Sequence, residues 1–212
     1  MKYQDNIQQI GALGPDYLGF IFYEKSPRNF TGPLPQLPES IKKIGVFVNA
    51  TTAEVLDKAI EFELNGIQLH GSESTSYCEE LKQSLQQAFQ KKQITVLPFL
   101  IKVFSVKDHF DFSVLKNHEP IVDYFLFDTK GDYAGGNGYT FDWELLKGYP
   151  SEKPFFLSGG IGIEQLEAIK NIDADLPVHA IDVNSQFERE PGLKDSTLVK
   201  EFITKLNEIK AH

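Results

Sequence analysis

Asp128 is the residue of this sequence best placed for acid–base chemistry. It ends the apolar run 124–127, which indicates a strand buried on both faces, and it opens the segment 129–138, which holds four glycines. A loop of that length inside a compact domain is usually functional or disordered. Asp128 is therefore a candidate catalytic group. The alternative is an aspartate that accepts backbone hydrogen bonds where the strand ends.

Two loops in the last third of the chain have the composition of an anion site. Gly159 and Gly160 follow one short apolar run, and Asn184 and Ser185 follow the next. Glycines before a helix let backbone N–H groups approach an anion. In α/β barrels the loops after the last two strands frequently bind phosphate. The sequence therefore predicts a phosphate site here, with tight packing as the alternative explanation of the glycine pair.

Arg28, Gln68 and His70 also lie at or just past the ends of predicted strands. A guanidinium in that place can bind a carboxylate or a phosphate through two parallel hydrogen bonds. Gln68 and His70 are two positions apart, so both side chains can point inward. The alternatives are a solvated surface residue for Arg28 and a hydrogen-bonded structural residue for His70.

The single cysteine and the five histidines give little sign of further chemistry. Cys78 falls in a helical pattern with apolar neighbours and is predicted to be a packing residue, not a nucleophile. One cysteine excludes an internal disulfide and fits a reducing compartment. The histidines show no ligand spacing, so no metal site is predicted.

Short apolar runs alternate with amphipathic helical patterns along the chain. Strands are predicted over 17–22, 44–48, 66–69, 94–101, 124–127, 155–157 and 180–183. Helices are predicted over 6–13, 53–64, 74–90, 106–117, 143–147, 163–171 and 195–209. This alternation is typical of parallel βαβ units.

Seven strands, with helices before the first and after the last, predict an α/β fold: a (βα)8 TIM barrel with strand 1 missing from the given chain. Residues 1–212 are expected to form a single, N-terminally truncated domain. A doubly wound open sheet is the alternative, but no GxGxxG turn follows any strand. Polar or glycine residues recur at the carboxyl ends of most strands, which suits the active face of a barrel.

Composition argues against several classes of partner. The net charge is −9 with no basic run, whereas nucleic-acid binding needs Lys and Arg against phosphates. A local pocket can still bind a small anion. No apolar run approaches the length that spans a bilayer, and the N-terminus is polar. We therefore expect a cytoplasmic protein that binds neither nucleic acid nor membrane.

A set of motifs runs in one order across nearly the whole chain. They cover residues 19–23 with 25–28, 45–49, 68–71, 127–130, 135–138 with 141–143, 157–160, and 182–185 through Glu188 to 191–192 and 194–195. In these motifs the sequence resembles phosphoribosylanthranilate isomerase, the (βα)8-barrel enzyme of tryptophan biosynthesis.

The resemblance implies an Amadori rearrangement of N-(5'-phosphoribosyl)anthranilate to the ketose 1-(2-carboxyphenylamino)-1-deoxyribulose 5-phosphate, without cofactor or metal. An acid must protonate the ribose ring oxygen, and a base must remove the C2' proton. By family position Asp128 is the general acid, and Arg28 pairs with the anthranilate carboxylate. The other positions carried over are Gly159, Gly160, Asn184 and Ser185 for phosphate binding, and Gln68, His70 and Asp182 for lining the pocket.

The chain departs from the family pattern at its start. Family members begin with a strand that ends in a Cys-Gly-Met-type motif, whose cysteine is the general base. Met1 matches the third residue of that motif, so strand 1 and the cysteine are expected to lie outside residues 1–212. The natural protein then starts upstream, or the barrel has lost its base. The first is favoured because the acid, the arginine and the phosphate loops are intact. Turnover of the given chain is expected to be lower by about 10²–10⁴-fold.

Two other functions stay open. One is a catalytically inert barrel that binds a sugar phosphate. The other is a related barrel such as indole-glycerol-phosphate synthase, which needs a catalytic lysine at a strand end, and Lys102 is the candidate. The protein is expected to be a monomer or a homodimer that binds a small phosphorylated substrate. The glycine-rich segment 130–139 is expected to close over it.

Overall fold

The computed structural model describes residues 1–129, 142–172 and 174–210 of the chain. The strands are β1 (Tyr17–Ile21), β2 (Lys42–Phe47), β3 (Gly66–Leu69), β4 (Phe99–Val106), β5 (Tyr124–Thr129), β6 (Phe155–Leu157), β7 (Val178–Ile181), β8 (Glu188–Glu190) and β9 (Leu193–Lys194). The α-helices are α1 (Gln4–Gly11), α2 (Thr52–Phe62), α3 (Thr75–Gln90), α4 (Leu166–Lys170) and α5 (Ser196–Lys210). The 3-10 helices are η1 (Phe112–Leu115), η2 (Trp143–Gly148), η3 (Ile163–Gln165) and η4 (Ser185–Phe187).

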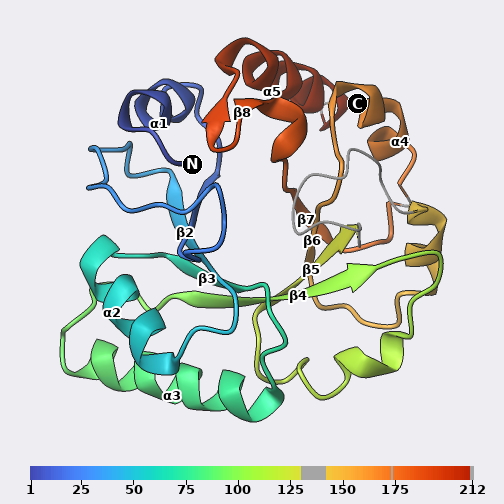
Figure 1. The fold of residues 1–212 in the computed structure, drawn as a ribbon. Helices are drawn as coiled ribbons and strands as arrows, with labels where there is room; N and C mark the ends of the chain where they lie inside the picture. The colour runs from blue at the N-terminus through green and yellow to red at the C-terminus, as the bar shows by residue number, and fades with distance from the viewer. Residues whose placement is uncertain (130–141, 173, 211–212) are drawn as a thin grey trace.

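Strands β1 to β7 form one parallel sheet in which spatial order equals sequence order. Parallel neighbours need a crossover connection between them, and most of these crossovers carry a helix. Figure 1 shows the helices around the outside of the curved sheet. The predicted barrel-type α/β fold with seven strands is confirmed. Among the described residues, β1 and β7 each pair with one neighbour and form the edges of the sheet.

The strand predicted over 94–101 and the helix predicted over 106–117 are wrong in position. The strand β4 begins after Pro98, which has no N–H to donate to a ladder, and it continues to Val106. The charged Lys102 interrupts the apolar pattern of this strand, yet its side chain is buried against Glu73. Between β4 and β5 the chain forms only the short helix η1, which Asp111 caps by accepting the Ser113 N–H.

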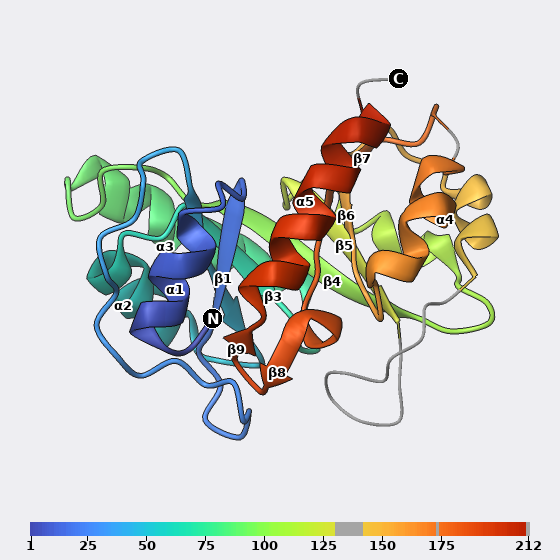
Figure 2. The same ribbon diagram turned by 90° about the horizontal axis from the view of Figure 1, so that it is seen from above.

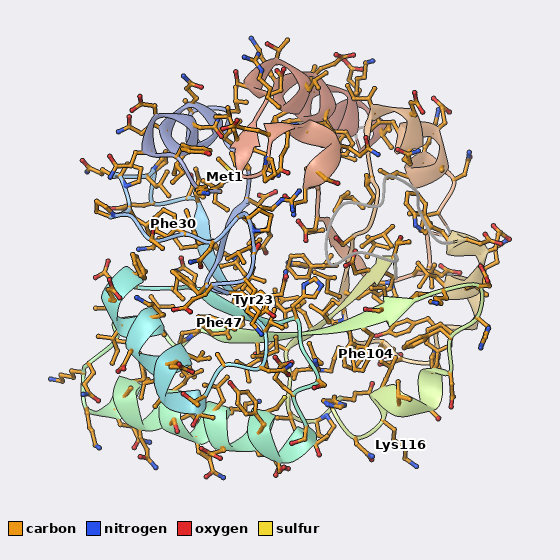
Figure 3. The ribbon with its side chains drawn as sticks, viewed as in Figure 1. Met1, Tyr23, Phe30, Phe47, Phe104 and Lys116 are labelled. Atoms are coloured by element: carbon orange, nitrogen blue, oxygen red, sulfur yellow. The ribbon has the colours of Figure 1, made fainter. Side chains whose placement is uncertain are left out.

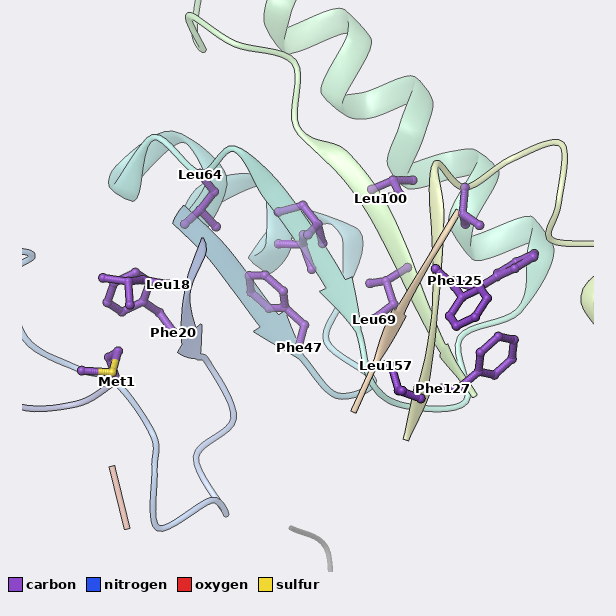
Figure 4. Packing of buried hydrophobic residues seen from close by; sticks show 14 of the residues in the cluster. Met1, Leu18, Phe20, Phe47, Leu64, Leu69, Leu100, Phe125, Phe127 and Leu157 are labelled. Carbon is purple, nitrogen blue, oxygen red and sulfur yellow. The ribbon is translucent and has the colours of Figure 1, made fainter. Parts of the chain in front are cut away.

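Each face of the sheet carries its own apolar cluster, because side chains alternate along a strand. The outer cluster packs under the helices, and Figure 4 labels Leu18, Phe20, Phe47, Leu69, Phe125, Phe127 and Leu157 among its members. The inner cluster fills the concave side with Ile44, Ile101, Val103, Leu126 and Phe156. Burying one such side chain contributes about 1.5–3 kcal/mol. The alternation therefore fixes which residues beyond each strand point into the barrel.

The helices α1 and α5 lie side by side next to the edge strands (Figure 2). Asn6 of α1 donates to the Lys194 carbonyl at 2.8 Å and accepts the Lys194 N–H at 2.8 Å, which ties α1 to β9. Met1 and Phe30, labelled in Figure 3, belong to the outer cluster. No helix of the described residues is long and apolar enough to cross a membrane. The loop predicted to close over the ligand, 130–139, lies outside the described residues.

Candidate functional site

The alternation that builds the inner cluster also points polar side chains into the barrel. Gln68 pairs in register with the inward Ile101. Asp128 lies two residues beyond the inward Leu126, and Ser158 lies two beyond the inward Phe156. Because side chains two apart on a strand share a face, these polar groups form a ring at the carboxyl ends of the strands.

This ring lines a cavity of about 550 Å³. Of the residues predicted from the sequence, the cavity is lined by Gln68, His70, Asp128, Gly159, Gly160, Asp182, Asn184 and Ser185. The structure thus brings all of them together except Arg28. Further lining comes from Ser158, Thr129 and Lys194 at the mouth and from inner-cluster residues below.

His70 links two of the predicted site residues. Its Nε2 lies 3.3 Å from Asp128 Oδ2, and its Nδ1 lies 3.2 Å from Gln68 Oε1. Since an amide oxygen only accepts, the Gln68 contact places a proton on Nδ1. The other ring nitrogen, Nε2, faces Asp128, so the contact with His70 fixes the direction of the Asp128 carboxyl group inside the cavity.

Asp182 supplies a second carboxyl group at the end of β7. The Ser158 hydroxyl donates to Asp182 Oδ2 at 3.4 Å. Burial raises the pKa of Asp182, and the neighbouring Asp128 carboxylate raises it further. The Asp182 carboxyl is therefore easier to protonate than that of an exposed aspartate.

The loop after β6 has a backbone that requires glycine. Gly159 and Gly160 have φ values of +94° and +67°, in the region that other residues rarely adopt. A Cβ on Gly159 would lie 2.3 Å from the backbone nitrogen of Thr129. The Thr129 hydroxyl in turn donates to the Gly159 carbonyl at 3.3 Å. The loop therefore presses against the end of β5, next to Asp128.

The loop after β7 is held by a buried lysine that the sequence reasoning gave no role. Lys194 Nζ donates to the Asn184 carbonyl at 2.9 Å, to Asn184 Oδ1 at 2.5 Å and to Glu188 Oε1 at 3.1 Å. All three ammonium protons are thereby used. The antiparallel pair β8–β9 brings Lys194 back to the loop. In the sequence, the turn at 191–192 that joins these two strands was the signal that could have indicated the role of Lys194.

Arg28 lies beside this network and does not line the cavity. Its Nε and Nη2 donate to the Glu188 carboxylate, with Nη2 2.7 Å from Oε2. Although burial alone would raise the pKa of Glu188, hydrogen bonds from Arg28 and Lys194 hold it below its ordinary value. Glu188 thus joins the predicted arginine to the lysine that lines the cavity.

Lys102 and Cys78 lie outside the cavity. Lys102 pairs in register with Leu69 and Phe125, so its side chain leaves the outer face of the sheet, opposite to Asp128. This position does not support the synthase reading, which needs a lysine in the cavity. Cys78 is fully buried in α3, and burial raises its thiol pKa to about 11. The prediction that Cys78 is a packing residue fits this environment.

Comparisons with known proteins agree on one family. Residues 2–205 match the family model described as N-(5'phosphoribosyl)anthranilate (PRA) isomerase. The N-(5'-phosphoribosyl)anthranilate isomerase of Parabacteroides distasonis is 43% identical over 214 residues, which span 97% of this chain and 90% of the relative. The crystal structure of the isomerase from Thermotoga maritima has a TM-score of 0.79 at 29% identity, covering 98% of this chain and 96% of that one. A structure of the isomerase in complex with reduced 1-(o-carboxyphenylamino)-1-deoxyribulose 5-phosphate has a TM-score of 0.76 at 26% identity, with coverage of 98% and 95%.

Proposed function

The chain belongs to the N-(5'-phosphoribosyl)anthranilate isomerase family, and from that premise we propose a role for each polar side chain of the cavity. The protein is an isomerase of tryptophan biosynthesis. It converts N-(5'-phosphoribosyl)anthranilate into 1-(2-carboxyphenylamino)-1-deoxyribulose 5-phosphate. The reaction needs an acid at the ribose ring oxygen and a base at C2', on opposite sides of the sugar.

Asp128 is the general acid in this proposal. The observation that supports it is the 3.3 Å contact between Asp128 Oδ2 and His70 Nε2 inside the cavity. His70 orients the Asp128 carboxyl through Nε2, while Gln68 holds its other ring nitrogen. When substrate enters, Asp128 donates a proton to the ribose ring oxygen. Asp182 shares the cavity, and burial raises its pKa, which makes it easier to protonate than an exposed aspartate.

The loops after β6 and β7 bind the phosphate in this proposal. Gly159 and Gly160 line the cavity and have positive φ values. Because glycine has no side chain, nothing separates their peptide groups from the cavity. Asn184 and Ser185 face the same cavity, and Lys194 adds a buried positive charge behind them. A dianionic phosphate is favoured there although the whole chain carries a charge of −9.

Arg28 binds the anthranilate carboxylate in this proposal, a role that the family resemblance implies and that requires the ligand to reach past the residues lining the cavity, because Arg28 is not one of them. Its contacts to Glu188 use Nε and Nη2, so this role leaves Nη1 to meet the substrate. The guanidinium has five N–H donors in a planar fork, which is enough to serve both carboxylates. Glu188 then fixes the direction of the fork.

The alternative function is an inert barrel that binds sugar phosphates without turnover. We test both by measuring ketose formation by the chain, by Asp128→Asn and by Asp57→Asn. Asp57 lies exposed on α2, so it is a matched control for the loss of one carboxylate. Asp128→Asn should lower turnover by about 10²–10⁴-fold, the usual contribution of a positioned acid, and Asp57→Asn should leave it unchanged. A chain extended upstream by a strand that bears the family cysteine is assayed beside them, and absence of turnover in the extended chain as well would favour the inert barrel.

The synthase reading and the oligomeric state need separate tests. If Lys102→Ala abolished product formation while Asp128→Ala stayed active, the synthase reading would replace the isomerase. We expect a monomer or a homodimer, as a Thermotoga maritima relative is described as dimeric, and light scattering on the purified chain distinguishes the two. We place the protein in the cytoplasm because its single, buried cysteine fits a reducing compartment.

A further inference from the structure

A buried ion pair lies on the outer face of the sheet, on the opposite side from the polar ring at the carboxyl ends of the strands. Lys102 Nζ is 2.9 Å from Glu73 Oε2, and the two side chains are 4% and 1% exposed. Neither residue lines the cavity. Removing two charges from water is costly, and such a pair is often no more stabilising than apolar residues of the same volume. The pair therefore needs an explanation other than stability.

The ammonium of Lys102 holds the backbone on both sides of His70. Besides the Glu73 contact, Nζ donates to the Leu69 carbonyl at 3.2 Å and to the Gly71 carbonyl at 2.8 Å. These two carbonyls belong to the residues immediately before and after His70. A lysine has three donors, and all three are used. The peptide groups around His70 are thus fixed by one buried cation.

The carboxylate of Glu73 completes the same frame. It accepts the Gly71 N–H at 3.0 Å and the Asn49 N–H at 2.9 Å. Asn49 Oδ1 accepts the Ser72 N–H at 2.8 Å. The frame therefore joins the carboxyl ends of β2 and β3 to the middle of β4. It leaves little space, since a Cβ on Gly71 would lie 2.4 Å from Asn49 Oδ1.

The residue held by this frame carries the imidazole that contacts the acid. The His70 side chain is 35% exposed, and its ring contacts Gln68 and Asp128. The backbone held by Lys102 fixes the place from which this side chain starts, and so keeps Nε2 within reach of Asp128. We propose that Lys102 and Glu73 are positioning residues for the isomerisation, which act by holding His70 against Asp128. This inference rests on the proposed role of Asp128.

The test uses the double variant Lys102→Met/Glu73→Gln, which removes both charges and leaves neither buried alone. We expect kcat to fall about 10-fold or more, because a misplacement of about 1 Å can cost up to 10²-fold. KM should change less than about threefold, since the phosphate loops lie on other strands. The matched control is Lys205→Met/Glu201→Gln, which removes the exposed pair on α5 and should change neither constant.

The decisive readout is the same double substitution in a His70→Asn background. If the pair acts through His70, the loss in kcat should shrink to less than about threefold there, because coupled residues are not additive. Losses that multiply across the two backgrounds, or a KM that rises as much as kcat falls, would overturn the inference and leave a purely structural role.

A second variant keeps the test sharp if the double variant does not fold. Asn49→Ala removes the contacts with Ser72 and leaves both buried charges of the frame in place. It should lower kcat in the protein that keeps His70 but not in the His70→Asn variant. An equal loss in both backgrounds would contradict the inference. An active Asp128→Asn would instead refute the proposed acid, so the two failures are distinguishable.

Discussion

Two buried Lys–Glu pairs lie at the mouth of the barrel, and they differ in which face of the sheet they serve. Lys102–Glu73 and Lys194–Glu188 have similar separations, 2.9 and 3.1 Å, and side chains at most 8% exposed. The first points to the helices and binds carbonyls of the loop that carries His70. The second faces the cavity and binds the loop proposed for phosphate.

Charge and burial alone therefore do not identify a site. Lys102 is the more buried lysine, yet its place in the register turns it away from the cavity. Lys194 shares Glu188 with Arg28, so that two cations surround one carboxylate. The excess positive charge next to the cavity favours an anion. The first pair shapes the acid side of the site, and the second gives the anion side its charge.

Breaking the second pair should have the largest effect on stability. Glu188→Gln leaves Arg28 and Lys194 buried without their carboxylate, which should lower the free energy of unfolding by about 3–5 kcal/mol at pH 7. Because the folded-state pKa lies below the ordinary value of 4.5, this stabilisation is present above pH 4.5 and is lost as the pH falls through the folded-state pKa. Urea unfolding of both proteins should therefore show a difference that shrinks below pH 4.5.

The control for this experiment is Glu190→Gln, an exposed position two residues along β8. It should change the free energy of unfolding by less than about 0.5 kcal/mol. A wild-type advantage over Glu188→Gln that stayed constant from pH 7 down to pH 3 would contradict the assigned pairing.

Substituting each pair in a separate variant should distinguish the pair that affects ligand binding from the pair that affects turnover. Lys194→Met removes the cation behind Asn184 and should weaken binding of the reduced product analogue by about 2 kcal/mol, some 30-fold. Lys102→Met/Glu73→Gln should leave that affinity within about threefold. Isothermal titration calorimetry on each variant gives both numbers. Equal losses would mean that the two pairs do not divide the site in the proposed way.

The glycine loop sharpens the comparison on the anion side. Gly159→Ala adds a methyl group 2.3 Å from Thr129 N at a φ of +94°, so it should cost about 1–3 kcal/mol of stability and weaken phosphate binding. Gly14 also has a positive φ, +72°, but a Cβ there meets nothing within 4 Å. Gly14→Ala therefore measures backbone strain alone. If both substitutions had the same effect on phosphate affinity, crowding at Thr129 would not be the cause.

The smallest effect is expected for Arg28→Lys. The variant keeps the positive charge beside Glu188 but loses the two-nitrogen contact, which should cost about 1 kcal/mol of stability. If Arg28 also binds the anthranilate carboxylate, KM should rise while the affinity for inorganic phosphate stays the same. An unchanged KM would remove Arg28 from the substrate site.

Strand patterns in the sequence indicated Asp128 and Gln68, because each lies near the end of a strand whose apolar residues set the period. Asp182 came from the family resemblance, and the structure places it just after β7, beside the same cavity. The bounds of β4 could not be predicted in the same way. In the sequence Lys102 reads as the residue that ends an apolar run, because nothing near it indicates a partner for its charge. That partner, Glu73, is 29 positions away and on another loop.

The pairing of Arg28 was equally hidden. Its carboxylate partner, Glu188, is 160 positions along the chain, and only the folded barrel brings the two together. The role of Lys194 depends on the β8–β9 turn, which positions its ammonium over Asn184. Local patterns therefore predicted the elements and the inward residues, whereas the long-range charge pairs required the structure.

The central claim is that Asp128 donates a proton and does not hold the ligand. The most direct measurement is the affinity of Asp128→Asn for reduced 1-(o-carboxyphenylamino)-1-deoxyribulose 5-phosphate, the ligand of a structural relative. We predict a Kd within about threefold of the wild-type value, despite a loss of turnover of about 10²–10⁴-fold. A Kd weakened by the same factor as turnover would show that Asp128 binds the ligand, and would contradict its role as the acid.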